Sequence, residues 1–128
     1  MTVELNHTIV SARDPQASAQ FLADILGLRV DPPVAHFTPV TPANHVSLDY
    51  GQREDFEPHH YAFMVSEQEF DAAVARIQHG GITYYGDPAC QEIGQIYHSK
   101  HTEGRRGTYF HDPDGHLMEL LTPGDAGS

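Results

Sequence analysis

The chain has 128 residues, 39% of them hydrophobic, which is enough for one globular domain with its own core. Acidic residues outnumber basic ones by 18 to 7, for a formal charge of −11, which excludes nucleic acid and anionic membranes as partners. The single cysteine, Cys90, excludes an internal disulfide. With no signal-peptide pattern and no apolar run of transmembrane length, the sequence predicts a cytoplasmic protein.

The first predicted element is a short β-branched strand over residues 5–11, which read LNHTIVS. Asp14 and Pro15 then provide an N-cap followed by proline at the first helical position, so a helix is expected to begin here. Gly27 supplies its C-terminal stop. Two strand-like segments and a charged linker rich in helix breakers follow, over residues 34–40, 45–50 and 51–58.

The second half begins with a predicted strand over residues 60–65, which read HYAFMV. Ser66 and Glu69 form a capping-box pattern at the start of a second helix, which ends at Gly80. A strand-like segment at residues 82–85 follows, and then a long polar segment over residues 86–107; a loop of that length in a compact domain is usually functional or disordered. Two further strand-like segments, at 108–111 and 116–122, flank the DPDG turn at 112–115.

The two halves repeat one order of elements with closely matched spacing. His7 precedes its helix cap by 7 residues and His60 by 6, and cap and terminating glycine are 13 residues apart in one half and 14 in the other. We therefore predict an α+β fold of two βαβββ modules, whose curved mixed sheets surround a shared metal-binding cleft. The single domain is expected over residues 1–124, with modules at about 5–50 and 59–122 and a tail at 125–128.

Three residues in these strands form a candidate metal site. His7 and His60 occupy equivalent positions in the first strand of each half, and Glu119 lies in the last strand, in phase with apolar neighbours. A carboxylate on an apolar face is costly unless it is paired or bound to metal. A single strand histidine is more often a packing residue, so the prediction depends on the matched placement. Two imidazoles and one carboxylate suit Fe, Mn, Zn, Co or Ni alike.

Three segments resemble the motifs of the vicinal oxygen chelate superfamily: LNHTIV, HHYAFMV and YFHDPDGHLMEL. This superfamily includes glyoxalase I, fosfomycin-resistance thiol transferases, extradiol dioxygenases and bleomycin-resistance proteins, and the resemblance spans about residues 5–122. It implies one divalent metal held by His7, His60 and Glu119. It also implies that this metal chelates adjacent oxygens of a small molecule and stabilises the negative charge that develops.

The resemblance leaves the reaction open. Glyoxalase I uses a fourth ligand, a glutamate, where this chain has Ser47, which disfavours that activity; Asp49, two residues on, is the alternative ligand. Tyr109 and the HYAF segment look most like the thiol transferases, but Ile9 stands where those enzymes have a threonine. Thiol transfer and iron-dependent ring-cleaving oxygenation are both open. The alternative outside enzymes is a metal-free drug- or metabolite-sequestering protein of the bleomycin-resistance type.

Further candidates surround the predicted site. The candidate catalytic residues are Tyr109, Arg105 and Arg106. Either arginine could bind an anionic group of the substrate through paired hydrogen bonds. His98 and His101, in the long loop, are candidate acid–base groups. The expected partners are a small-molecule substrate and a second copy of the chain. In such a homodimer, the metal site is either contained in one chain or shared between two.

Overall fold

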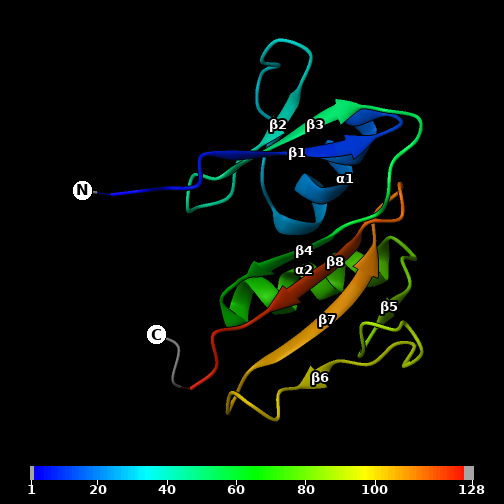
Figure 1. Cartoon of the computed structure of the whole chain (residues 1–128). Helices are drawn as coiled ribbons and strands as arrows, with labels where there is room; N and C mark the ends of the chain where they lie inside the picture. Colours follow the sequence, from blue (N-terminus) through cyan, green and yellow to red (C-terminus); the bar gives the residue numbers. More distant parts are fainter. Residues whose placement is uncertain (1, 126–128) are drawn as a thin grey trace. The chain divides into compact units, whose positions relative to one another are not determined.

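The computed structural model describes residues 2–125, which divide into two compact units between Glu57 and Pro58 (Figure 1). This division falls inside the predicted linker. The predicted α+β class is confirmed, because each unit has one helix and a sheet with both parallel and antiparallel pairs. Of the predicted tail at 125–128, only Asp125 lies within the described residues.

Unit 1 packs its helix on one face of a three-stranded sheet of order β1-β3-β2, in which β1 and β3 are parallel. The buried side chains of Leu22, Val10 and Tyr50 come from the helix and from two strands and form its core. The elements of this unit are β1 (His7–Ala12), α1 (Pro15–Leu26), β2 (Thr38–Val40) and β3 (Ser47–Gln52).

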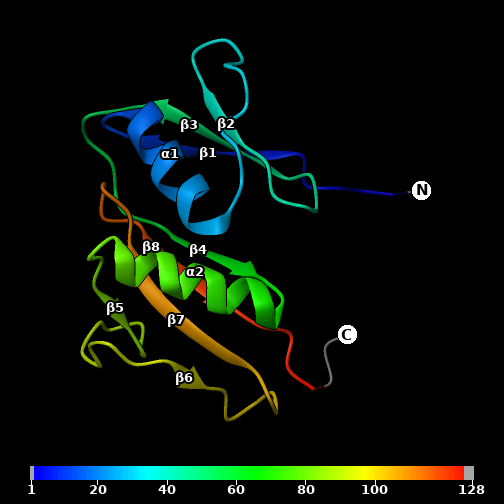
Figure 2. The ribbon, with the colours of Figure 1, turned by 180° about the vertical axis from the view of Figure 1, so that it is seen from behind.

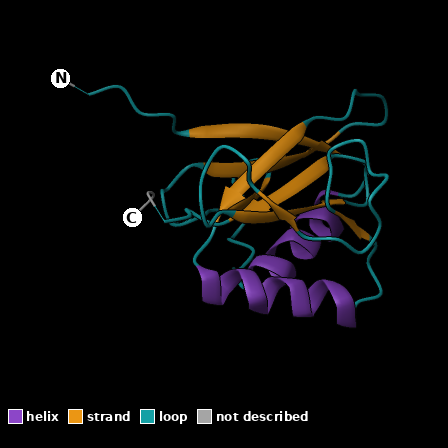
Figure 3. Cartoon of the chain, turned by 90° about the horizontal axis from the view of Figure 1, so that it is seen from below, coloured by secondary structure: helices purple, strands orange, loops and turns teal. Residues whose placement is uncertain are grey.

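Unit 2 also packs one helix on one face of its sheet, which has more strands than that of unit 1. Its sheet has the order β4-β8-β7-β5, with β6 also paired to β7, and only the β4–β8 pair is parallel. Phe70 and Ile77 of the helix and Phe110, Met118 and Leu120 of the strands are fully buried. In each unit the helix lies on one side of its own sheet (Figure 2 and Figure 3). The elements are β4 (His60–Met64), α2 (Glu67–His79), β5 (Tyr84–Tyr85), β6 (Tyr97–His98), β7 (Arg106–His111) and β8 (Leu117–Leu121).

Both predicted helix starts are confirmed by their capping contacts. Asp14 accepts a hydrogen bond from the backbone of Ala17, and Ser66 and Glu69 form the complete capping box. The predicted stop at Gly27 is confirmed too, because this residue takes the left-handed conformation at φ 70°. None of the described helices is long and apolar enough to span a membrane.

The strands differ from the prediction in two places. The predicted strand at 34–40 shortens to β2, because Val34 and Phe37 pair with each other across a tight turn and Ala35 takes a φ of 54°. Unit 1 consequently has two strands after its helix where three were predicted. The only further pairing with β2 in its described residues is the isolated bridge between Val30 and Val40. In unit 2, β6 arises inside the segment predicted as a long loop.

Candidate metal centre

The register of β4, β8 and β7 brings three predicted site residues together on one face of the unit 2 sheet. Glu119 on β8 pairs with Ala62 on β4 and with Tyr109 on β7, while His60 lies on the same side of β4, two residues from Ala62. The alternate residues Met118 and Leu120 are buried on the face that packs against α2. The candidate ligands therefore lie on the open face of the sheet, opposite its helix-covered core.

His60 and Glu119 already contact each other. The Nε2 atom of His60 lies 3.1 Å from Oε1 of Glu119, and the carboxylate side chain is only 12% exposed against 45% for the imidazole. A largely buried carboxylate is stable only with partners. A proton on Nε2 of His60 can form a hydrogen bond to Oε1 of Glu119, and a divalent cation bound to both atoms can replace that proton. The pair therefore supplies two suitable donors for one cation.

Tyr97 holds the second oxygen of this carboxylate. Its hydroxyl donates a hydrogen bond of 2.6 Å to Oε2 of Glu119. The ring reaches this position because β6 pairs with β7 opposite Gly107, where any Cβ would overlap the phenol. Burial and the neighbouring Glu119 raise the pKa of Tyr97 above its usual range, so it stays protonated and continues to donate at neutral pH. Only Oε1 is then turned toward His60.

Tyr109, which was predicted as a candidate catalytic residue, lies beside the His60–Glu119 pair. Its ring centroid is 6.0 Å from that of His60, edge to face, and 5.7 Å from that of Tyr97. Burial first, and then the charge of Glu119 and a hydrogen bond to its side chain, raise the pKa of Tyr109 to about 12. At neutral pH Tyr109 is therefore an uncharged phenol that can donate a hydrogen bond on the open face.

The DPDGH motif anchors the strand that carries His60. Oδ1 of Asp112 accepts hydrogen bonds from the backbone amides of Asp114 and His116, both 2.9 Å. Nδ1 of the buried His116 accepts from the backbone amide of His59, also at 2.9 Å, so the turn is tied to the residue before His60. Burial raises the pKa of Asp112 above its usual range. These contacts give the motif a structural role, which is to position the backbone next to the candidate ligand His60.

His7 belongs to unit 1, where it is exposed at the start of β1 and pairs with Ser47 of β3. Its Nδ1 lies 2.8 Å from Oδ1 of Asn6. When Nδ1 of a neutral imidazole donates to this amide oxygen, the lone pair of Nε2 is available to a metal. This arrangement is common for metal-binding histidines. Asp49 lies on the same face, and Ser47, the position of the glyoxalase ligand, donates to it at 2.5 Å.

The two arginines are engaged elsewhere in unit 2. Arg106 forms ion pairs with Glu67 at 2.7 Å and Asp71 at 2.8 Å, both on α2, which is the covered side of the sheet. The side chain of Arg105 donates to the backbone oxygen of Thr122 at 2.9 Å. Arg106 is therefore held away from the His60–Glu119 pair. Arg105 lies close enough to Tyr97 for its charge to oppose the rise in the pKa of that phenol, and its candidate role stays a prediction. Both loop histidines, His98 and His101, are exposed.

Neither unit, over the residues that the structure describes, gathers three His, Cys, Asp or Glu side chains around one point. Unit 2 supplies the His60–Glu119 pair, and unit 1 supplies His7. The three-ligand set of His7, His60 and Glu119 therefore stays a prediction.

Comparison with known proteins identifies the family. A model of the Glyoxalase/Bleomycin resistance protein/Dioxygenase superfamily matches residues 4–120. The chain belongs to this superfamily. It resembles the solved structure of Oxidase ChaP-H2 with a TM-score of 0.91 and 52% identity, covering 100% of both chains. For Oxidase ChaP-H1 the TM-score is 0.89 and the identity 47%, over 94% of this chain and 96% of that one. Glutathione transferase FosA from Serratia marcescens is 30% identical over 127 residues, 94% of this chain and 81% of FosA. All three relatives are named as enzymes.

Proposed function

We propose that this member of the superfamily is a metal-dependent enzyme that oxidises a small molecule with dioxygen, at a site formed by His7, His60 and Glu119. The observation that carries the reaction class is the 52% identity to Oxidase ChaP-H2 over the full length of both chains. FosA, at 30% identity, is the more distant relative, so thiol transfer is less well supported. The His60–Glu119 contact of 3.1 Å supports the metal site.

Each residue of such a site would have a separate role. A divalent metal bound there supplies Lewis acidity for chelating adjacent substrate oxygens and stabilising their negative charge. His60 and His7 each offer one imidazole nitrogen, and Glu119 offers Oε1. Tyr97 keeps Oε2 of Glu119 hydrogen-bonded, which fixes the orientation of the carboxylate. In this proposal Tyr109, an uncharged donor, binds an oxygen of the substrate.

Dioxygen balances the proposed reaction in either of two forms. An oxidase removes two electrons and two protons from the substrate and reduces dioxygen to hydrogen peroxide. A dioxygenase transfers both oxygen atoms into the product and releases no peroxide. Both forms consume dioxygen without consuming a thiol, which separates them from thiol transfer.

Oxygen uptake by protein loaded anaerobically with Fe²⁺ tests this function. The substrates are catechols, α-hydroxyketones and 1,2-diketones, which all carry adjacent oxygens, and a parallel assay follows glutathione consumption with an epoxide. We expect oxygen uptake that matches substrate loss and is absent in Glu119→Ala, with peroxide detection distinguishing the oxidase from the dioxygenase. Glutathione consumption without oxygen uptake would support the transferase instead. Ligand binding without turnover of any substrate would favour the sequestering protein.

We also propose that the chain works as a homodimer in which the metal site is shared between two copies. Membership of the superfamily supports the homodimer, because proteins of this family commonly form dimers. Mixing His7→Ala chains with Glu119→Ala chains tests this, because a shared arrangement restores one intact site in every mixed dimer. Metal binding should then return to about half of the sites in each mixed dimer. If mixing restores no metal binding although mixed dimers form, each site lies within one chain.

A further inference from the structure

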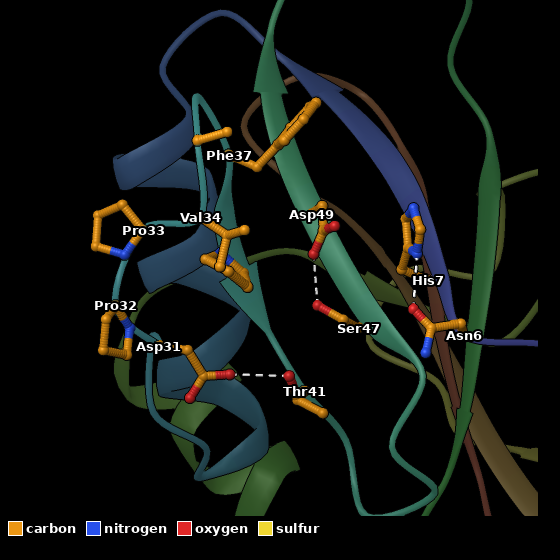
Figure 4. Close-up of a pocket in the computed structure, with 12 residues that line it drawn as sticks. Asn6, His7, Asp31, Pro32, Pro33, Val34, Phe37, Thr41, Ser47 and Asp49 are labelled. Carbon is orange, nitrogen blue, oxygen red and sulfur yellow. Dashed lines mark hydrogen bonds between the residues drawn. The ribbon is translucent and has the colours of Figure 1, made fainter.

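Unit 1 contains a groove that is lined in part by His7 and extends to residues with no role in the proposed metal site. Its volume is 710 Å³, within the range of about 300–1,000 Å³ typical of small-molecule sites. One side is the open face of the sheet, with His7, Ser47 and Asp49, and the other is the loop that follows α1 (Figure 4). The loop and β2 contribute the apolar lining, which consists of Pro32, Pro33, Val34, Ala35, Phe37 and Pro39.

The apolar side of the groove is held in place by its own contacts. A Cβ on Gly51 would lie 2.8 Å from Cε1 of Phe37, so the phenyl ring rests directly on the strand at a position without a side chain. Prolines restrict the backbone of the loop, and Asp31 at its start accepts a hydrogen bond from Thr41 at 2.8 Å. A groove with fixed apolar walls binds a rigid ring system at low entropic cost.

The polar side of the groove is acidic. Asp31 and Asp49 line it, and none of its lining residues is a lysine or arginine. Oδ1 of Asp49 accepts from Ser47, while Oδ2 has no hydrogen-bond partner within the part of the chain that the structure describes. This oxygen can accept a hydrogen bond from a ligand, and the two carboxylates repel a negatively charged ligand.

We propose that this groove binds the ring portion of the substrate, and that it selects an uncharged ring system carrying a hydroxyl group. The ring packs against Phe37 and Val34, and the hydroxyl donates to Asp49. Molecules with a carboxylate, phosphonate or sulfonate on the ring are rejected. Naming this ligand as the substrate rests on the proposed function, whereas the groove's preference for an uncharged ring does not.

Fluorescence titration of metal-free protein with 1-naphthol and 1-naphthalenesulfonate tests the preference. The two probes share a ring system and differ in charge. We expect one naphthol per chain and sulfonate binding that is at least about tenfold weaker. Phe37→Ala should weaken naphthol binding by about tenfold and Phe37→Leu by less, because it keeps an apolar side chain. Asp49→Asn should reduce the difference in affinity between naphthol and sulfonate, because it removes one negative charge from the groove.

Ile93→Ala serves as the control, because this apolar side chain is 67% exposed and lies in unit 2. Equal or tighter binding of the sulfonate would overturn the proposal. So would naphthol binding that is the same in wild type, Phe37→Ala and Ile93→Ala, with circular dichroism showing that all three are folded. Because the titration uses metal-free protein, failure of the oxygen-uptake test alone would remove only the link between the groove and the reaction.

Discussion

Glu119→Ala is expected to abolish tight metal binding and leave the fold intact. The substitution removes the carboxylate whose Oε1 lies 3.1 Å from His60, and Tyr97 loses only a hydrogen-bond acceptor on the open face of the sheet. Loss of an outer-shell partner typically costs 10–100-fold in metal affinity, so loss of a ligand should cost more than about 100-fold. Titration with Zn²⁺ measures the affinity, and circular dichroism checks the fold.

His60→Ala should behave in the same way, while His36→Ala and His79→Ala should leave the metal content unchanged. These two control histidines are exposed. The four variants therefore separate loss of a ligand from loss of any histidine. Stoichiometric metal retained in both Glu119→Ala and His60→Ala would rule out the ligand assignment.

Gly107→Ala is expected to weaken metal binding although Gly107 contributes no ligand. A methyl group there would overlap the Tyr97 ring and displace its hydroxyl from Glu119. Tyr97→Phe removes the same hydrogen bond directly. Each variant should lose roughly 10–100-fold in metal affinity, and the double variant should lose little more than either one, because both act through one contact.

Tyr84→Phe is the matched control, since it removes a tyrosine hydroxyl from the same sheet that is hydrogen-bonded to Gln78 rather than to Glu119. Co²⁺ titration is the readout, because its absorption spectrum also reports any change in coordination geometry. Unchanged affinity in Tyr97→Phe would contradict the positioning role, as would losses that simply add in the double variant.

The helices could be predicted from the sequence because their signals are local. Asp14 and Ser66 lie within three residues of the amides that they cap, so the pattern and the contact lie in the same short segment. The pairing of His60 with Glu119 could be predicted in part, because the two halves repeat and strand periodicity assigned each residue to a face. The parallel pairing of β4 with β8 then brings residues 59 positions apart into contact.

Tyr97 could not be predicted, because its role depends on a contact 22 residues away. The only local signal was Gly107, a glycine at the edge of a predicted strand, which often marks a close approach of other atoms. The candidate role of Arg106 came from its charge, which does not indicate the face it occupies. Its strand position is in phase with the buried Thr108 and Phe110, and that periodicity would have placed it on the helix-covered side.

The proposed metal site is tested most simply by elemental analysis of protein purified without a histidine tag or added metal, beside His7→Ala prepared identically. We expect about one Fe, Mn, Zn, Co or Ni per chain in the natural sequence and loss of that metal in the variant. Equal metal in both preparations would contradict the assignment of His7. The absence of metal in both, with no thermal stabilisation when these metals are added, would contradict a metal-dependent enzyme altogether.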